Sequence, residues 1–125
     1  MRELLAVAIG GSIGASLRWL VVSSLGKMYP SAFPWGTFAV NTLGSLCLGF
    51  LSVYLLDRVN VSSEVRLALM VGLLGSFTTF STFALDAYRL IEAHAYGLFM
   101  LYISGQFLLS LAFVVLGIFL ANNYT

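Results

Sequence analysis

Long apolar stretches alternate with short polar segments along the whole chain. A helix needs about 20 apolar residues to cross the hydrocarbon core of a bilayer, and four stretches are long enough. They are Leu4–Leu25, Phe33–Leu56, Val65–Tyr88 and Ala95–Ala121. Polar segments at 26–31, 57–64 and 89–94 separate them. The pattern predicts a single all-α membrane domain over residues 1–125, with four transmembrane helices and both termini on the same side.

The composition is that of a membrane protein. Hydrophobic residues make up 60% of the chain and charged residues only 9%, whereas soluble domains carry about 25% charged residues. Such a chain cannot cover a water-exposed surface, so we expect a multi-pass protein of the cell (inner or plasma) membrane, surrounded by the lipid bilayer. Six basic residues nearly balance five acidic ones without forming a basic run, so no nucleic-acid partner is expected.

The distribution of basic residues between the two ends of the helices is almost even. Orientation in the membrane follows the Lys and Arg content of the short loops. One side carries Arg2, Arg58 and Arg66, and the other carries Lys27 and Arg89, with Arg18 if it faces that side. The chain could therefore insert both ways and pair as an antiparallel dimer, or a weak bias could fix one topology.

Small residues mark faces where helices can pack closely. Gly10 and Gly14 form a Gly-x-x-x-Gly pair in the first span, and Ser45 and Gly49 repeat this spacing in the second. Small side chains let helix backbones approach in a membrane, where packing rather than hydrophobicity drives association. Four short helices enclose little room for a wide internal pathway, so a pore is easier to build between subunits.

The run 72–83 in the third span combines two glycines, five hydroxyl side chains and three phenylalanines. Irregular backbone at bilayer depth is tolerated only where protein or a water-filled cavity covers it, so this run predicts a helix that bends or breaks to line a pathway. Phe80 and Phe83 share one helix face. They could simply pack, or their partly positive ring edges could face a small anion, with neighbouring hydroxyls donating to the same ion.

Three further polar features lie within apolar spans, and each has two interpretations. Arg18 is either functional or a long side chain that reaches the interface beside Trp19. Asn41 either bonds two helices together or donates its amide hydrogens to an anion in transit. A stripe on the fourth span, repeating every four residues, indicates either a polar track or interhelical hydrogen bonds. The stripe is formed by Tyr102, Gln106 and Ser110.

Other kinds of chemistry have little support in the sequence. All five acidic residues fall at or near the ends of the spans, which weakens proton-coupled transport through a buried carboxylate. The chain lacks a nucleotide motif and a catalytic set of residues, so we do not expect an enzyme. A small multidrug exporter would need a membrane-embedded Glu in the first span, where Glu3 lies at the extreme end. A structural subunit of a larger complex would leave the hydroxyl and Phe cluster unexplained.

Three segments carry a resemblance to a known family. They are 10–19 (GGSIGASLRW), 36–45 (GTFAVNTLGS) and 72–83 (GLLGSFTTFSTF), the last being the most specific. In this order and spacing they resemble the Fluc (CrcB) fluoride channels over essentially the whole chain. The resemblance implies a fluoride-selective channel that exports fluoride passively from the cytoplasm and so gives fluoride resistance.

The resemblance also implies an assembly and a set of site residues. It implies an antiparallel, dual-topology homodimer with two pores, a broken third helix, and a sodium ion at the dimer interface held by the backbone carbonyls of Gly75 and Thr78. The residues that it assigns to the fluoride pathway are Phe80 and Phe83 (the Phe box), Asn41, the vestibule residue Arg18, and Ser81, Thr82 and Ser110 on a polar track. The chain departs from the pattern of relatives at Asp86 and Val114, and Gln106 stands where relatives vary.

Overall fold

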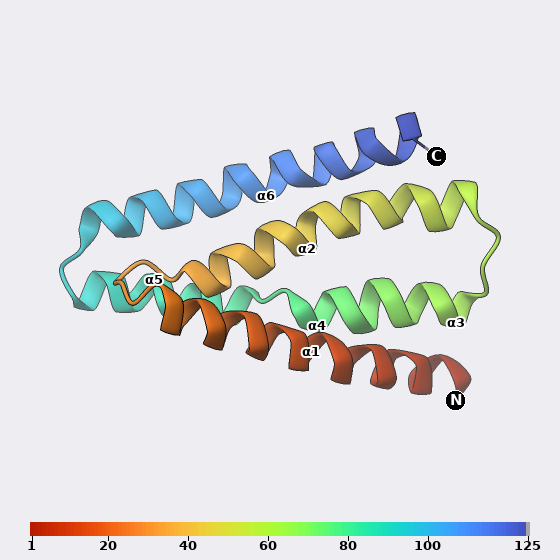
Figure 1. Cartoon of the computed structure of the whole chain (residues 1–125), viewed down its shortest axis with the longest axis horizontal. Coiled ribbons are helices and arrows are strands. Elements are labelled where there is room, and N and C mark those ends of the chain that lie inside the picture. Colours follow the sequence, from red (N-terminus) through yellow and green to blue (C-terminus); the bar gives the residue numbers. More distant parts are fainter. Residues whose placement is uncertain (125) are drawn as a thin grey trace.

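The computed structural model describes residues 1–124 and consists of helices joined by short connections (Figure 1). The first span is α1 (Arg2–Met28), and the second is α2 (Trp35–Val53) continued by the π-helical turn η1 (Tyr54–Arg58). The third comprises α3 (Ser63–Arg66), the π-helical η2 (Leu67–Leu74), α4 (Gly75–Phe77) and α5 (Phe80–Glu92). The fourth is α6 (Tyr96–Tyr124).

These elements form four stretches long and apolar enough to cross a membrane, which confirms the four predicted spans. One predicted boundary is wrong: Phe33 precedes α2, because Pro34 occupies the N-cap position and the residue before a proline avoids helical backbone. Ser62 caps α3 by accepting a hydrogen bond from the N–H of Val65, at 3.4 Å. Both termini lie at the same end of the molecule, as predicted (Figure 1).

The helices pack in two main pairs. α1 runs beside the third span, and α6 runs beside α2 (Figure 1). A Cβ atom added to Gly14 would collide with the backbone carbonyl of Leu73, and one added to Gly49 would collide with that of Val114. The predicted close packing at small residues is therefore confirmed, because backbones touch where these glycines lie.

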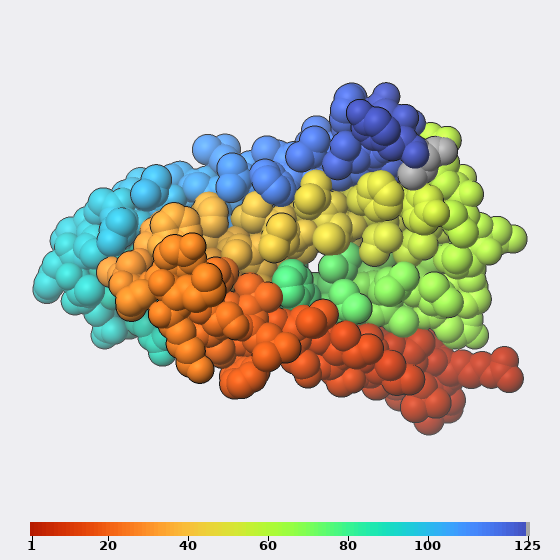
Figure 2. Space-filling view, in the orientation of Figure 1, coloured from red at the N-terminus to blue at the C-terminus, as the bar shows by residue number. Residues whose placement is uncertain are grey.

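Much of the apolar surface faces outward, as expected for helices that contact lipid. Large exposed side chains follow the outer faces of α1 and α6, including Ile9 and Leu108. A compact buried cluster forms at one end, where Phe33, Leu90 and Tyr102 meet. A small opening between α2 and the third span is visible near the middle of the molecule (Figure 2).

Candidate functional site

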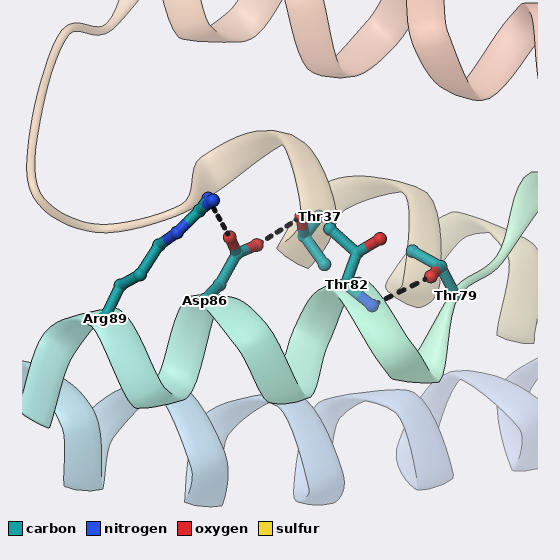
Figure 3. Close-up of polar contacts among 5 residues, drawn as sticks. All are labelled: Thr37, Thr79, Thr82, Asp86 and Arg89. Carbon is teal, nitrogen blue, oxygen red and sulfur yellow. Dashed lines mark hydrogen bonds and ion pairs between the residues drawn. The ribbon is translucent and has the colours of Figure 1, made fainter.

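Helical backbone stops at Phe77 and resumes at Phe80. Thr78 has φ −85° and ψ 160°, and Thr79 has φ −154° and ψ 122°, so both residues are extended. Thr79 is also the N-cap of α5, and its hydroxyl oxygen accepts a hydrogen bond from the N–H of Thr82 at 3.2 Å (Figure 3). A β-branched residue with a capping hydroxyl suits this position, because it favours extended backbone and starts the next helix.

Asn41 of α2 holds the extended segment in place. Its Oδ1 accepts from the N–H of Thr79 at 2.8 Å, and its Nδ2 donates to the C=O of Thr79 at 3.0 Å. The side-chain amide thus satisfies backbone groups that the interrupted helix cannot, which is a requirement at bilayer depth. Nδ2 also lies 3.5 Å from Oε1 of Gln106. Both amide hydrogens of Asn41 therefore have protein partners, as the interhelical interpretation requires.

A groove of about 540 Å³ lies where α2, the extended segment and α6 meet. It brings together four of the predicted pathway residues, namely Asn41, Phe80, Phe83 and Ser110. Its other lining residues are Gly44, Ser45, Leu48, Thr78, Thr79, Ile103, Gln106, Phe107, Leu111 and Val114. The predicted residues Arg18, Gly75, Ser81 and Thr82 are not part of this lining.

The hydroxyl groups around the groove fall into two classes. Ser45 donates to the backbone carbonyl of Asn41 at 2.7 Å, and Thr78 donates to that of Leu74 at 3.0 Å, so their hydrogens are already used. Ser110 instead accepts, from Nε2 of Gln106 at 2.9 Å. Among residues 1–124, the hydroxyl hydrogens of three predicted pathway residues have no acceptor. These residues are Ser81, Thr82 and Ser110.

The two phenylalanines occupy different environments. Their ring centroids are 5.9 Å apart with planes inclined at 48°. Phe83 packs against Tyr102 at a centroid distance of 5.0 Å, whereas Phe80 is 79% exposed on the single chain. Phe80 therefore lines the groove while most of its ring faces out of the single chain.

The polar stripe of α6 faces α2. Gln106 is only 5% exposed, and its Nε2 donates to Ser110 and, at 3.3 Å, to the hydroxyl of Thr42. Tyr102 is fully buried, and its hydroxyl has no hydrogen-bond partner in the described part of the chain. Both interpretations of the stripe find support: Gln106 bonds α6 to α2, while Ser110 lines the groove and keeps a hydroxyl hydrogen without an acceptor.

A second polar cluster, which the sequence analysis missed, lies beyond the groove on α2 and α5. Thr37 donates to Oδ2 of Asp86 at 2.7 Å, and Nη1 of Arg89 lies 3.7 Å from Oδ1 (Figure 3). The Asp86 side chain is 14% exposed and that of Arg89 is 65% exposed. The available signal was spacing, because Thr37 precedes Asn41 by one helical turn and therefore shares its face.

Arg18 binds the extended segment from the other side. Its Nη1 donates to the C=O of Thr78 at 3.3 Å, so the guanidinium contacts protein backbone instead of only reaching the interface beside the exposed Trp19. The C=O of Gly75 has lost its usual helical donor, because the N–H of Thr79 is bonded to Asn41. The N–H of Thr82 is likewise bonded to the Thr79 hydroxyl, so the C=O of Thr78 also lacks its helical donor, and Arg18 contacts it instead.

Comparison with known proteins identifies the family. The model of the family described as CrcB-like protein, Camphor Resistance (CrcB), matches residues 5–118. The chain belongs to the CrcB-like family. The resemblance found in the sequence is therefore confirmed, and this CrcB-like chain is a multi-pass membrane protein.

Three curated relatives of this CrcB-like chain share one name. The fluoride-specific ion channel FluC of Agrobacterium fabrum is 44% identical, with 98% of each chain covered. The protein of the same name from Phocaeicola vulgatus is 40% identical, covering 98% of this chain and all of the relative. That from Hydrogenobaculum sp. is 43% identical, covering 94% and 96%. The family is one of ion channels, which confirms that the CrcB-like chain is not an enzyme.

Proposed function

We propose that this chain is a fluoride-selective ion channel that lets fluoride leave the cytoplasm passively. In acidic surroundings fluoride enters cells as neutral HF, which dissociates in the more neutral cytoplasm and is trapped there as the anion. An open pathway lets the anion flow out down its gradient, which lowers intracellular fluoride and gives resistance. The observation that carries the proposal is the groove that gathers Asn41, Phe80, Phe83 and Ser110, in a chain whose relatives are named fluoride-specific ion channels.

The groove presents partly positive hydrogens to an anion. It does so without a full positive charge, which would trap the ion. A small anion holds its water tightly, and burying it unpaired would cost on the order of tens of kcal/mol in the Born limit. The Ser110 hydroxyl and the ring edges of Phe80 and Phe83 present partial positive charge that can replace part of this shell. Conduction also requires that the ion can leave again, which favours several weak sites over one strong site.

We further propose that two chains assemble as an antiparallel homodimer with dual topology and one pore along each groove, giving two pores. The 79% exposure of Phe80 supports this arrangement, because a second chain would cover the ring and close the groove. Ser81 and Thr82 do not line the groove of the single chain, and their hydroxyl hydrogens have no acceptor among residues 1–124. A second chain that extends the groove would place these hydroxyls along the pore. The nearly even distribution of basic residues supports insertion in both orientations.

The interrupted third span also suits a structural sodium ion at the dimer interface. Sodium is a hard cation that prefers oxygen ligands, and carbonyls released by a broken helix provide them. Gly75 is exposed and its carbonyl has lost its helical donor, while the Thr78 carbonyl keeps a second lone pair beside Arg18. Two such carbonyls from each chain would hold the ion, which would supply a fixed positive charge near both pores.

Fluoride efflux from liposomes tests the proposed function. Vesicles loaded with fluoride and containing the purified protein should release it rapidly once potassium ionophore removes the opposing voltage, as followed with a fluoride electrode. Phe80→Ile should slow release strongly, because it removes the ring edge from the groove. The matched control Phe119→Ile changes a 56% exposed ring on α6 outside the groove and should leave release unchanged. Equal release by Phe80→Ile and the wild type would reject the assigned role of Phe80.

The assembly is tested separately from the flux. A protease-accessible tag at the C-terminus of the protein in native membranes should be cleaved from both faces if insertion is dual. Cleavage from one face alone would contradict the antiparallel dimer while leaving the fluoride pathway itself open to the efflux test.

A further inference from the structure

The backbone of Thr79 orients the side-chain amide of Asn41, and Asn41 in turn orients that of Gln106. The N–H of Thr79 can only donate and its C=O can only accept, so Asn41 must turn Oδ1 toward the N–H and Nδ2 toward the C=O. The second hydrogen of Nδ2 then points to Gln106, whose Oε1 lies 3.5 Å away. Gln106 in turn must direct Nε2 toward Ser110, 2.9 Å away.

This direction determines what Ser110 can do. Because Nε2 of Gln106 has only hydrogens to offer, the Ser110 oxygen accepts and its own hydrogen remains for another acceptor. A serine inside a helix ordinarily donates to the carbonyl four residues earlier. The hydroxyls of Ser45 and Ser104 make this bond, with oxygen–oxygen distances of 2.7 and 2.6 Å. Ser110 does not use the equivalent carbonyl, which belongs to Gln106.

The burial of Gln106 makes the arrangement persistent. The side chain is 5% exposed, and all three of its hydrogen bonds are to protein side chains, the third being to Thr42 at 3.3 Å. A buried amide with partners on both ends has no alternative orientation that keeps them, since a flip would place donor against donor at Asn41. Successive hydrogen bonds in one direction also polarise one another in a low-dielectric interior.

We propose that Gln106 is a positioning residue for fluoride conduction. It continues a directed hydrogen-bond chain from the extended backbone at Thr79, through Asn41, to Ser110, and so leaves the Ser110 hydroxyl hydrogen for the anion in the groove. Gln106 itself need not touch fluoride, because it acts through Ser110. The inference rests on the proposed fluoride-channel function and extends it to a residue that lines the groove beside Ser110.

A double-mutant cycle in the liposome efflux assay tests this role. Gln106→Met keeps the length of the side chain but removes the amide, so the Ser110 hydroxyl should return to the backbone carbonyl of residue 106. Gln106→Met and Ser110→Ala should each slow fluoride release about tenfold. This is roughly the change in rate expected when one hydrogen bond to an ion is lost. The double variant should lie within about twofold of either single variant, because both changes remove the same donor. Ser104→Ala, on the same helix but with its hydroxyl bonded to backbone, should conduct like the wild type.

The possible outcomes separate the inference from the proposed function. Wild-type vesicles that retain fluoride would refute the channel function itself. A conducting wild type with an unaffected Gln106→Met variant, or with single effects that multiply to about a hundredfold in the double variant, would overturn the positioning role alone. Size-exclusion profiles of all variants check their assembly. If Gln106→Met does not assemble, Gln106→Ala removes the same amide and carries the same expectations.

Discussion

Replacing Asn41 separates its structural role from any role in conduction. Asn41→Ala removes both bonds to Thr79 and leaves a buried N–H and C=O unsatisfied, since Thr79 is 8% exposed. Each unsatisfied group costs about 1–3 kcal/mol, so the expected loss of stability is about 2–6 kcal/mol. Asn41→Asp keeps the shape and the acceptor for the Thr79 N–H, but it sets a carboxylate oxygen against the Thr79 carbonyl and places negative charge in the groove.

The two variants should therefore differ in a defined way. Thermal unfolding in detergent should show a loss of stability for both, while fluoride efflux should be lower for Asn41→Asp than for Asn41→Ala because the new charge repels the anion. Asn123→Asp is the matched control, since Asn123 is exposed near the end of α6 and bonds only to the carbonyl of Phe119 at 2.7 Å. Wild-type efflux and stability in Asn41→Asp would refute both the role of Asn41 in holding Thr79 and the anion pathway.

Two other substitutions test the framework around the groove. Gly14→Val should prevent monodisperse assembly in size-exclusion chromatography, because its Cβ collides with the backbone of Leu73, whereas Gly26→Val has open space around it and should assemble normally; equal behaviour would contradict the close packing. Thr37→Val should lower thermal stability by about 1.5–3 kcal/mol, since it removes a 2.7 Å hydrogen bond from the largely buried carboxylate of Asp86; an unchanged melting temperature would show that this carboxylate finds another donor.

The hydrophobic pattern was sufficient to predict the four spans, because length and apolarity alone decide whether a segment can cross a bilayer. Local chemistry also identified residues that the groove gathers, since Phe80 and Phe83 are neighbours on one helix face. The exact start of α2 was predicted less well. Phe33 is apolar enough to join the span, but Pro34 after it excludes helical backbone there.

The partners of polar residues could not be predicted in the same way. Asn41 bonds Thr79, 38 residues later, and Arg18 bonds Thr78, 60 residues later. Such pairs depend on which faces of separate helices meet, which no local period encodes. The sequence left two interpretations open for Asn41 and for the α6 stripe for this reason. The hydrogen-bond directions around Gln106 became clear only once the Thr79 backbone was placed beside Asn41.

Anion selectivity is the property that tests the central claim most directly. The measurement is the simultaneous efflux of fluoride and chloride from liposomes loaded with both ions and containing the wild-type protein, each followed with its own electrode. The account predicts rapid release of fluoride while chloride stays inside at the rate of protein-free vesicles, because the groove offers closely placed hydrogens suited to the smaller anion. Equal release of the two anions, or retention of both, would contradict it.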